Sequence, residues 1–391
     1  MIKILLDKNK DLLKVLLIII LQYIVFFTPI FNPNNALVGN FTTDARSLHY
    51  PSRYYLYERL KNHEFPFWTE RIYSGFPIYA DLERGYLNPA NIILTYTLGP
   101  VNSFKVLHFS FYAAGAFGLY FLLKRKDIGL AGFFVANTIF YFSLYNMVKQ
   151  ELFNSIFVIY LIPLSLYYSE IFLESRKLKY AGYNALTSWF LLTFGQINFL
   201  VIFLLIKFIY FFAFALKKVS WKSVFQYIAT FSFILTMLSL PVILPAYQIF
   251  KGGVRYSSGF DYLEGSFPPI LVLNGLFPFI WGTPSKFIGE LLNSEYLFNE
   301  VHFYAGISAL IFAIIGIAAI KNKREKIFLF LLFLVFILLS FIRSIPILNT
   351  DGFLPLTAFR YWGRASIYFV FAVSYGAAFF TENLSKQNAI H

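Results

Sequence analysis

KVLHFSFYAAGAFGLYFLLKRKDIGLAGFFVANTIFYFSLYNM, residues 105–147, places a short basic loop between two long apolar runs. Each run approaches the roughly 20 apolar residues that an α-helix needs to cross a bilayer. Positive charge is concentrated between the runs, in Lys124-Arg125-Lys126. The same pattern recurs through a chain of 391 residues that is 58% hydrophobic and contains 50 Phe. The sequence therefore predicts a helical protein embedded in a membrane.

Ten apolar runs predict an all-α polytopic membrane protein with about ten transmembrane helices. The whole chain, 1–391, is expected to form a single integral membrane domain. The first run is not expected to be a cleaved signal peptide, because it is long and no small-residue cleavage site follows it. The expected spans are 12–31, 105–123, 129–147, 152–173, 181–196, 198–216, 223–249, 302–320, 327–343 and 361–380.

Short basic loops alternate with long loops, and this alternation predicts the orientation of the chain. Under the positive-inside rule the short basic loops face the cytoplasm, and both termini then do so as well. The long loops 32–104, 250–301 and 344–360 become extracytoplasmic. The basic segments are 1–14, 124–128, 174–180, 217–222, 321–326 and the tail with Lys386.

The long loops are aromatic and rich in Pro and Gly, which is typical of folded structure rather than of disordered linkers. Segment 44–62 is expected to be helical with a break at Pro51, and segment 66–94 to pack on the membrane surface. Segment 266–282, SFPPILVLNGLFPFIWG, is too apolar for a free loop and too interrupted by Pro for a span. A re-entrant or interfacial element is the natural interpretation of that segment.

Composition excludes several classes of protein. The chain has no Cys, so it has neither disulfides nor a thiolate metal site. The net charge of +13 does not predict nucleic-acid binding, because the basic residues are distributed between the spans. That distribution is expected for topology signals and for contacts with anionic lipids. The spans contain very few ionisable residues, mainly Lys207, which argues against an ion-coupled transporter.

An early acidic residue in the first long loop is the main candidate for catalysis. Asp44 lies in GNFTTDAR, residues 39–46, shortly after the first span. A carboxylate at the membrane–water boundary can meet the polar end of a lipid substrate and act as a general base. The alternative is that Asp44 or Thr43 simply caps the following helix.

Three arginines near the ends of predicted spans are candidates for binding phosphate. Arg255 follows the seventh span, and Arg360 and Arg364 begin the tenth. Guanidinium groups at this boundary suit bidentate binding of phosphate. The spacing of Arg360 and Arg364 predicts that they share one helix face. The alternative is that these side chains reach to lipid headgroups.

Other polar residues of the long loops have weaker signals. Glu300 and His302 are two residues apart and do not share a helix face, so a metal pair is not expected there. Gln196 fits ordinary turn chemistry. Asp81 is expected either to pair locally with Arg84 or to provide a second carboxylate.

Several aromatic and proline-rich motifs occur in a characteristic order along the chain. They are Asp44 followed by Tyr50-Pro51, Phe65-Pro66-Phe67-Trp68, Gly75-Phe76-Pro77, Tyr86-Leu87-Asn88-Pro89, Gly195-Gln196, Leu244-Pro245-Ala246-Tyr247, Arg255-Tyr256-Ser257, Glu300 before Tyr304-Ala305-Gly306, and Phe359-Arg360-Tyr361-Trp362-Gly363-Arg364. In this order the chain resembles the membrane glycosyltransferases of the GT-C superfamily, and most closely the YfhO-like bacterial membrane proteins.

The resemblance implies a GT-C-like fold with a helical first extracytoplasmic loop and an inverting glycosyltransferase. The donor would be a sugar linked to polyprenyl phosphate, and the acceptor a glycan or lipid of the cell envelope. Catalysis would take place on the extracytoplasmic face of a bacterial cytoplasmic membrane, with Asp44 as general base. Arg255, Arg360 and Arg364 would bind the donor phosphate. The further substrate contacts implied are Tyr50, Trp68, Asp81, Gln196, Glu300 and His302.

The expected partners are therefore the lipid-linked donor, the envelope acceptor and the bilayer, with no nucleic acid. No cofactor is expected, and a divalent metal, which some members of the superfamily use, is not favoured. Two alternatives stay open, a transporter or flippase of lipid-linked glycans and a non-catalytic membrane scaffold. A flippase needs a polar path across the bilayer, and transmembrane segments as apolar as these do not readily line one.

Overall fold

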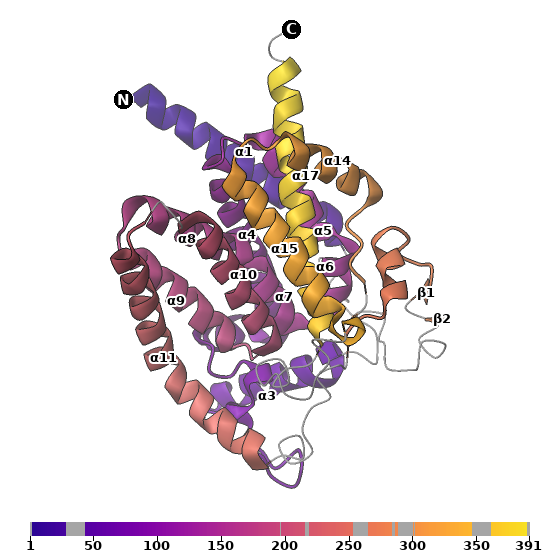
Figure 1. Cartoon of the computed structure of the whole chain (residues 1–391). Coiled ribbons are helices and arrows are strands. Elements are labelled where there is room, and N and C mark those ends of the chain that lie inside the picture. Colours follow the sequence, from indigo (N-terminus) through magenta and orange to yellow (C-terminus); the bar gives the residue numbers. More distant parts are fainter. Residues whose placement is uncertain are drawn as a thin grey trace.

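The protein is mostly helical, as the apolar runs predict (Figure 1). The computed structural model describes residues 2–28, 44–195, 197–215, 219–252, 265–283, 286–287, 300, 302–345 and 361–388. In these residues the regular β structure is one short antiparallel pair, β1 (Gly282–Thr283) and β2 (Lys286–Phe287).

Helices overlap every one of the ten predicted apolar runs. Five helical segments of the described residues are long and apolar enough to cross a membrane: Pro89–Lys124, Phe153–Ser175, Ile197–Ala215, Trp221–Gly252 and Trp362–Gln387. The helices that correspond to the runs are α1 (Ile2–Phe26), α4 (Pro89–Lys124), α5 (Leu130–Phe142) with α6 (Leu144–Val148), α7 (Phe153–Tyr160) with α8 (Ile162–Ser175), α9 (Lys179–Leu192), α10 (Ile197–Ala215), α11 (Trp221–Gly252), α14 (Ile307–Ala319), α15 (Lys323–Ser340) and α17 (Ser366–Asn388).

The last helix of the chain occupies the interior of the bundle. α17 packs against α5, α14 and α15, and Figure 1 shows it (yellow) running beside α15. Gly316 of α14 and Gly376 of α17 lie where these helices meet, and a Cβ on Gly316 would overlap the Gly376 carbonyl oxygen. Small residues at such a contact let two backbones approach closely, which is a common way to pack helices in membranes.

A second close contact joins α4 to α8 and the end of α7. A Cβ on Gly115 would overlap the carbonyl oxygen of Tyr160 and lie 2.6 Å from the Tyr141 hydroxyl. Gly118 faces the backbone of Leu164 in the same way. The absence of a side chain at these positions therefore sets the distance between the two helices.

Replacing Gly115 with Ala is expected to lower the free energy of unfolding by about 1–3 kcal/mol, because the added methyl group must displace backbone atoms. Gly182→Ala is the matched control, since among the described residues its Cβ would have only Ile234 within contact distance, at 3.6 Å. Gly182 is half-buried, and Ala within a helix gains about 0.5–1 kcal/mol over Gly. Thermal unfolding in detergent measures both, and equal melting temperatures for the two variants would contradict the packing assignment.

α11 is covered by the rest of the molecule far less than the other long helices. Only 17% of its most apolar stretch is buried, against 61–83% for the other four. It contacts α9 and, towards its end, the short helix η2 (Ile78–Ala80). Its exposed apolar side chains, among them Phe233 and Leu244, suit contact with lipid.

The first long loop is compact and helical at its start. η1 (Ala45–His49) is a π-helical turn that continues into α3 (Tyr50–Lys61), so the break predicted at Pro51 is wrong. Pro51 lies in the first turn of α3, where its missing N–H is not needed. α3 packs on α4, and η1 contacts the short helix η3 (Leu82–Arg84).

The helix that follows this loop begins earlier than predicted. α4 starts at Pro89, where the Asn88 side chain accepts a hydrogen bond from the Asn91 N–H. The helix bends at Gly99, which has φ 77° and ψ 173° and precedes Pro100. A left-handed φ suits Gly, and Pro cannot donate a helical hydrogen bond, so the two residues together produce the kink.

Candidate functional site

Asp44 stands at the first position of the helical segment formed by η1 and α3. Its side chain is exposed and makes no capping hydrogen bond. The capping role that the sequence left open is therefore not seen for Asp44, and Thr43 lies outside the described residues. Ala45 and His49 point to the buried side of the same turn. The carboxylate is thus available to a substrate, and η1 anchors its backbone.

Glu300 is the centre of a buried ion cluster that joins three distant parts of the chain. Its carboxylate lies 2.6 Å from Nη2 of Arg364 and 2.5 Å from Nζ of Lys149. All three side chains are at most 8% exposed. Tyr145 also donates a hydrogen bond to the Arg364 carbonyl oxygen, at 2.8 Å. We call Lys149, Glu300 and Arg364 the Glu300 cluster.

Two cations, Lys149 and Arg364, contact the one carboxylate of Glu300. Burial alone would raise the pKa of Glu300, but Arg364 and Lys149 outweigh burial and lower that pKa to about 2. The carboxylate is therefore ionised at neutral pH.

Arg364 is the only predicted phosphate-binding arginine among the described residues. Its guanidinium holds Glu300 through Nε and Nη2, and also lies over the rings of Phe199 (4.9 Å) and Tyr361 (4.8 Å). With a side chain 8% exposed, it does not reach out to lipid headgroups as the alternative required. Arg255 and Arg360 lie outside the described residues.

The prediction that Arg360 and Arg364 share one helix face involves Arg360, which lies outside the described residues. The helical turn η8 (Trp362–Ala365) begins only at Trp362, and the residue before it, Tyr361, has φ 60° and ψ 44°.

The remaining predicted contacts are dispersed over the first and second long loops. Trp68 is 54% exposed and Tyr50 is half-buried. Asp81 forms the predicted local pair with Arg84, at 2.8 Å. His302 donates a hydrogen bond from Nε2 to the carbonyl oxygen of Pro278, at 2.6 Å. Gln196 is outside the described residues.

Among the predicted residues that the structure describes, Glu300 and Arg364 are thus the two that it brings together. No group of three or more His, Asp or Glu side chains suited to a metal occurs in the described part of the chain.

Sequence reasoning missed Arg53 and His49, one helical turn apart on the buried side of the first long loop. Arg53 lies over the rings of Phe153 (4.9 Å) and Phe104 (5.7 Å). The His49 ring is 6.0 Å from the Phe153 ring. Two residues four apart in a helical segment, such as His49 and Arg53, lie on the same face of the helix. Only the packing of the helix shows that this face is buried.

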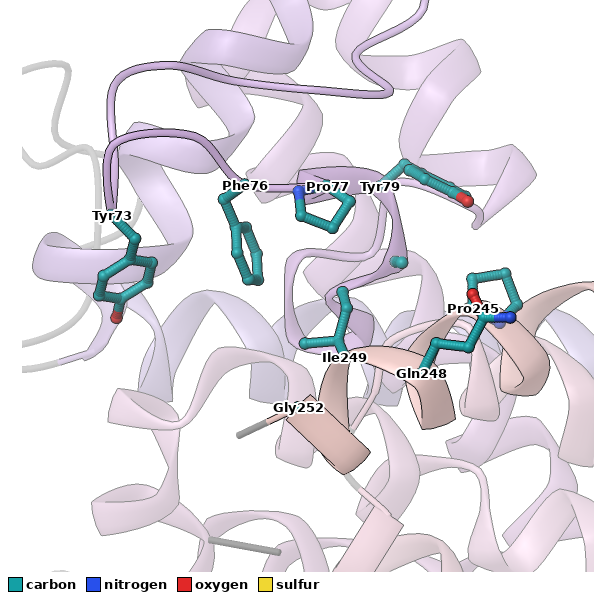
Figure 2. Close-up of a pocket in the computed structure, with 9 residues that line it drawn as sticks. Tyr73, Phe76, Pro77, Tyr79, Pro245, Gln248, Ile249 and Gly252 are labelled. Atoms are coloured by element: carbon teal, nitrogen blue, oxygen red, sulfur yellow. The ribbon is translucent and has the colours of Figure 1, made fainter. Parts of the chain in front are cut away.

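An aromatic pocket separates the first long loop from the end of α11 (Figure 2). Its volume is about 490 Å³, which is the size of a small-ligand site. Figure 2 shows Tyr73 and Tyr79 towards opposite ends, with Gln248 contributed by α11. Aromatic faces and one amide suit a sugar ring or an isoprenoid segment. The lining residues are Tyr73, Phe76, Pro77, Tyr79, Ala80, Pro245, Gln248, Ile249 and Gly252.

A buried polar network runs between helices that sequence analysis treated as apolar spans. His108 of α4 lies 2.9 Å from the Tyr23 hydroxyl and 2.7 Å from the Gln150 side-chain oxygen. Gln150 also donates to the Tyr160 hydroxyl, at 3.0 Å. Each polar group in this network finds a partner, so it stabilises the packing of the helices rather than leaving a polar path through them.

A second ion cluster lies at the other end of the helical pair α5 and α6. Lys126, just before α5, is 2.8 Å from Glu170 and 3.1 Å from Glu325. All three side chains are at most 8% exposed. A lysine that the sequence assigned to membrane topology is thus also an internal structural charge.

No protein-family model matches this chain, and no curated protein matches it.

Proposed function

We propose that this protein is a membrane glycosyltransferase that takes a sugar from a polyprenyl-phosphate-linked donor. The sugar passes to a glycan or lipid acceptor of the cell envelope, on the extracytoplasmic side. The observation that carries the proposal is Asp44, an exposed carboxylate without a capping bond on an anchored helical turn. A carboxylate in this state can accept a proton.

The position of Asp44 relative to positive charge supports the same reaction. His49 and Arg53, on the same helical segment, contact Phe153, which follows Lys149 by only four residues. Asp44 and the Glu300 cluster therefore belong to the same end of the helical bundle. A base and buried cations at one end suit a reaction that releases a phosphate.

The proposed topology has ten spans, with both termini in the cytoplasm. Its support is the overlap of a helix with every apolar run and the basic character of the short loops. In this orientation the first long loop, Asp44 and the aromatic pocket are all extracytoplasmic, where a lipid-linked donor can reach them.

The proposed reaction is a single inverting displacement. Asp44 removes the proton from an acceptor hydroxyl, whose oxygen forms a bond to the anomeric carbon. The bond between that carbon and the phosphate oxygen breaks, and polyprenyl phosphate leaves with the electron pair. Arginine groups, among which we propose Arg255, Arg360 and Arg364, stabilise the negative charge that develops on the phosphate.

Reconstitution of the full chain into liposomes tests this function. Polyprenyl-phosphate sugars with a radiolabelled sugar are supplied together with an envelope fraction as acceptor. The expected result is label in the acceptor and an equal amount of released polyprenyl phosphate. A folded protein that moves the donor to the inner leaflet without any transfer would favour the flippase alternative. If a panel of donors is neither used for transfer nor moved across the membrane, only the scaffold alternative remains.

A further inference from the structure

Arg53 is a buried guanidinium without an acidic partner in the part of the chain that the structure describes. It lies in α3, is 6% exposed, and its Nη1 has no hydrogen-bond partner among the described residues. Burial lowers its pKa to about 9, so the group still carries its positive charge at neutral pH. A buried charge without a counter-ion is costly, and proteins rarely retain one without a use for it.

The neighbouring arginines show that carboxylates are available in this loop. Arg59 pairs with Glu64, Arg71 with Glu58, and Arg84 with Asp81, at 2.7–2.8 Å. These three side chains are 37%, 61% and 11% exposed, so each is more exposed than Arg53. The most deeply buried of the four is therefore the one that lacks a carboxylate, which is the reverse of what stability alone favours.

A histidine and a second arginine lie close to Arg53. His49 precedes it by one helical turn and is buried beside it, and Arg84 donates a hydrogen bond to Ser52. Burial, together with the charges of Arg53 and Arg84, lowers the pKa of His49 to about 3, so its ring is neutral. The same field that repels a proton from His49 attracts an anion.

The ring contacts of Arg53 leave its donors available. Phe153 and Phe104 contact the guanidinium at 4.9 and 5.7 Å, and contacts of this kind use the π face rather than the N–H groups. The planar fork of an arginine suits two oxygens of a phosphate.

We propose that Arg53 forms the centre of an anion subsite that binds a phosphate group, with the neutral His49 ring and the Arg84 guanidinium beside it. The phosphate chemistry follows from the unpaired guanidinium. Its source, a lipid carrying that phosphate, rests on the proposed function.

Ligand binding to the full chain in nanodiscs of zwitterionic lipid tests the subsite. The variant is Arg53→Met, which keeps the contacts with the two Phe rings and removes the charge. Arg71→Met is the matched control, because Arg71 belongs to the same loop and is 61% exposed. The probes are polyprenyl phosphate, polyprenol without phosphate, and inorganic phosphate at constant ionic strength.

For the wild type we expect polyprenyl phosphate to bind and to raise the melting temperature. Arg53→Met should bind it at least ~10-fold more weakly, a loss of about 1.4 kcal/mol in binding free energy. Without ligand the same variant should melt at a higher temperature than the wild type, because an uncompensated buried charge has been removed. Arg71→Met should match the wild type in both measurements.

If inorganic phosphate by itself raises the melting temperature, the site binds the anion from any source. If only polyprenyl phosphate does so, the site binds a phosphate carried by a lipid. Equal binding of polyprenol and polyprenyl phosphate would overturn the subsite. So would an Arg53→Met protein that is less stable and binds like the wild type, since Arg53 would then be structural. If Arg53→Met does not fold, Arg53→Lys keeps the charge without the planar fork, and unchanged affinity would overturn the proposal.

The binding assay contains no sugar, which separates its outcome from that of the transferase. Phosphate binding that depends on Arg53 in a protein without transfer activity would leave the subsite in place and remove the proposed function alone.

Discussion

Asp44→Asn is expected to lower the rate of sugar transfer by about 10²–10⁴-fold, which is the contribution of a positioned general base. Asn matches Asp in shape and hydrogen-bonding reach but cannot take the acceptor proton. The loss corresponds to roughly 2.7–5.4 kcal/mol of transition-state stabilisation. Initial rates in liposomes, at saturating donor, measure it.

The fold should not change in this variant, because the Asp44 side chain is exposed and makes no capping bond. Its melting temperature is therefore expected to equal that of the wild type. Asp127→Asn is the matched control. Asp127 is also exposed, and its φ of 56° is a conformation that Asn tolerates well. A transfer rate that Asp44→Asn leaves unchanged would show that Asp44 is not the base.

Glu300→Gln is expected to reduce the free energy of unfolding by about 3–5 kcal/mol, which is the usual loss when one partner of a buried ion pair is removed. The change removes the buried carboxylate that Lys149 and Arg364 both contact. Thermal or denaturant unfolding in detergent measures the difference. Glu58→Gln is the control, since its pair with Arg71 is exposed and should change stability little.

The pH dependence of the Glu300→Gln effect has a defined sign. The pKa of Glu300 is lowered to about 2 in the folded protein, below the value of about 4.3 for an unfolded chain. The ionised group therefore contributes stability above about pH 4.3, and this contribution is lost as the pH falls towards 2. The difference in the free energy of unfolding between the wild type and Glu300→Gln should be constant from about pH 6 to 8 and should become smaller in acid. A gap that grows on acidification would contradict the pairing.

Local hydropathy was enough to predict the helices but not their ends. A helix overlaps each apolar run, because burial of apolar side chains in lipid or in the bundle depends on composition over about 20 residues. The start of α4 at Pro89 and its kink at Gly99 were missed. Both depend on single-residue chemistry, a cap by Asn88 and a left-handed glycine, which averaged hydropathy does not register.

The candidate site was predicted only in part, since its residues come from distant segments. Asp44 and Arg364 were singled out from their positions beside spans, and Asp81 was correctly expected to pair with Arg84. Lys149 was not recognised, although it holds Glu300. Arg53 was missed because a guanidinium in an aromatic, charged loop looks exposed until α3 is packed on α4.

The sequence by itself determined the membrane class, the helical content and the separation of basic short loops from long aromatic loops. These follow from hydropathy and charge, which each segment carries independently of its neighbours. Only the tertiary structure decided which charges are paired. It joined residues 149, 300 and 364 into one cluster and left Arg53 buried without an acid among the described residues. Pairing and desolvation depend on atoms a few ångströms away in space, and those atoms are set by helix packing rather than by position along the chain.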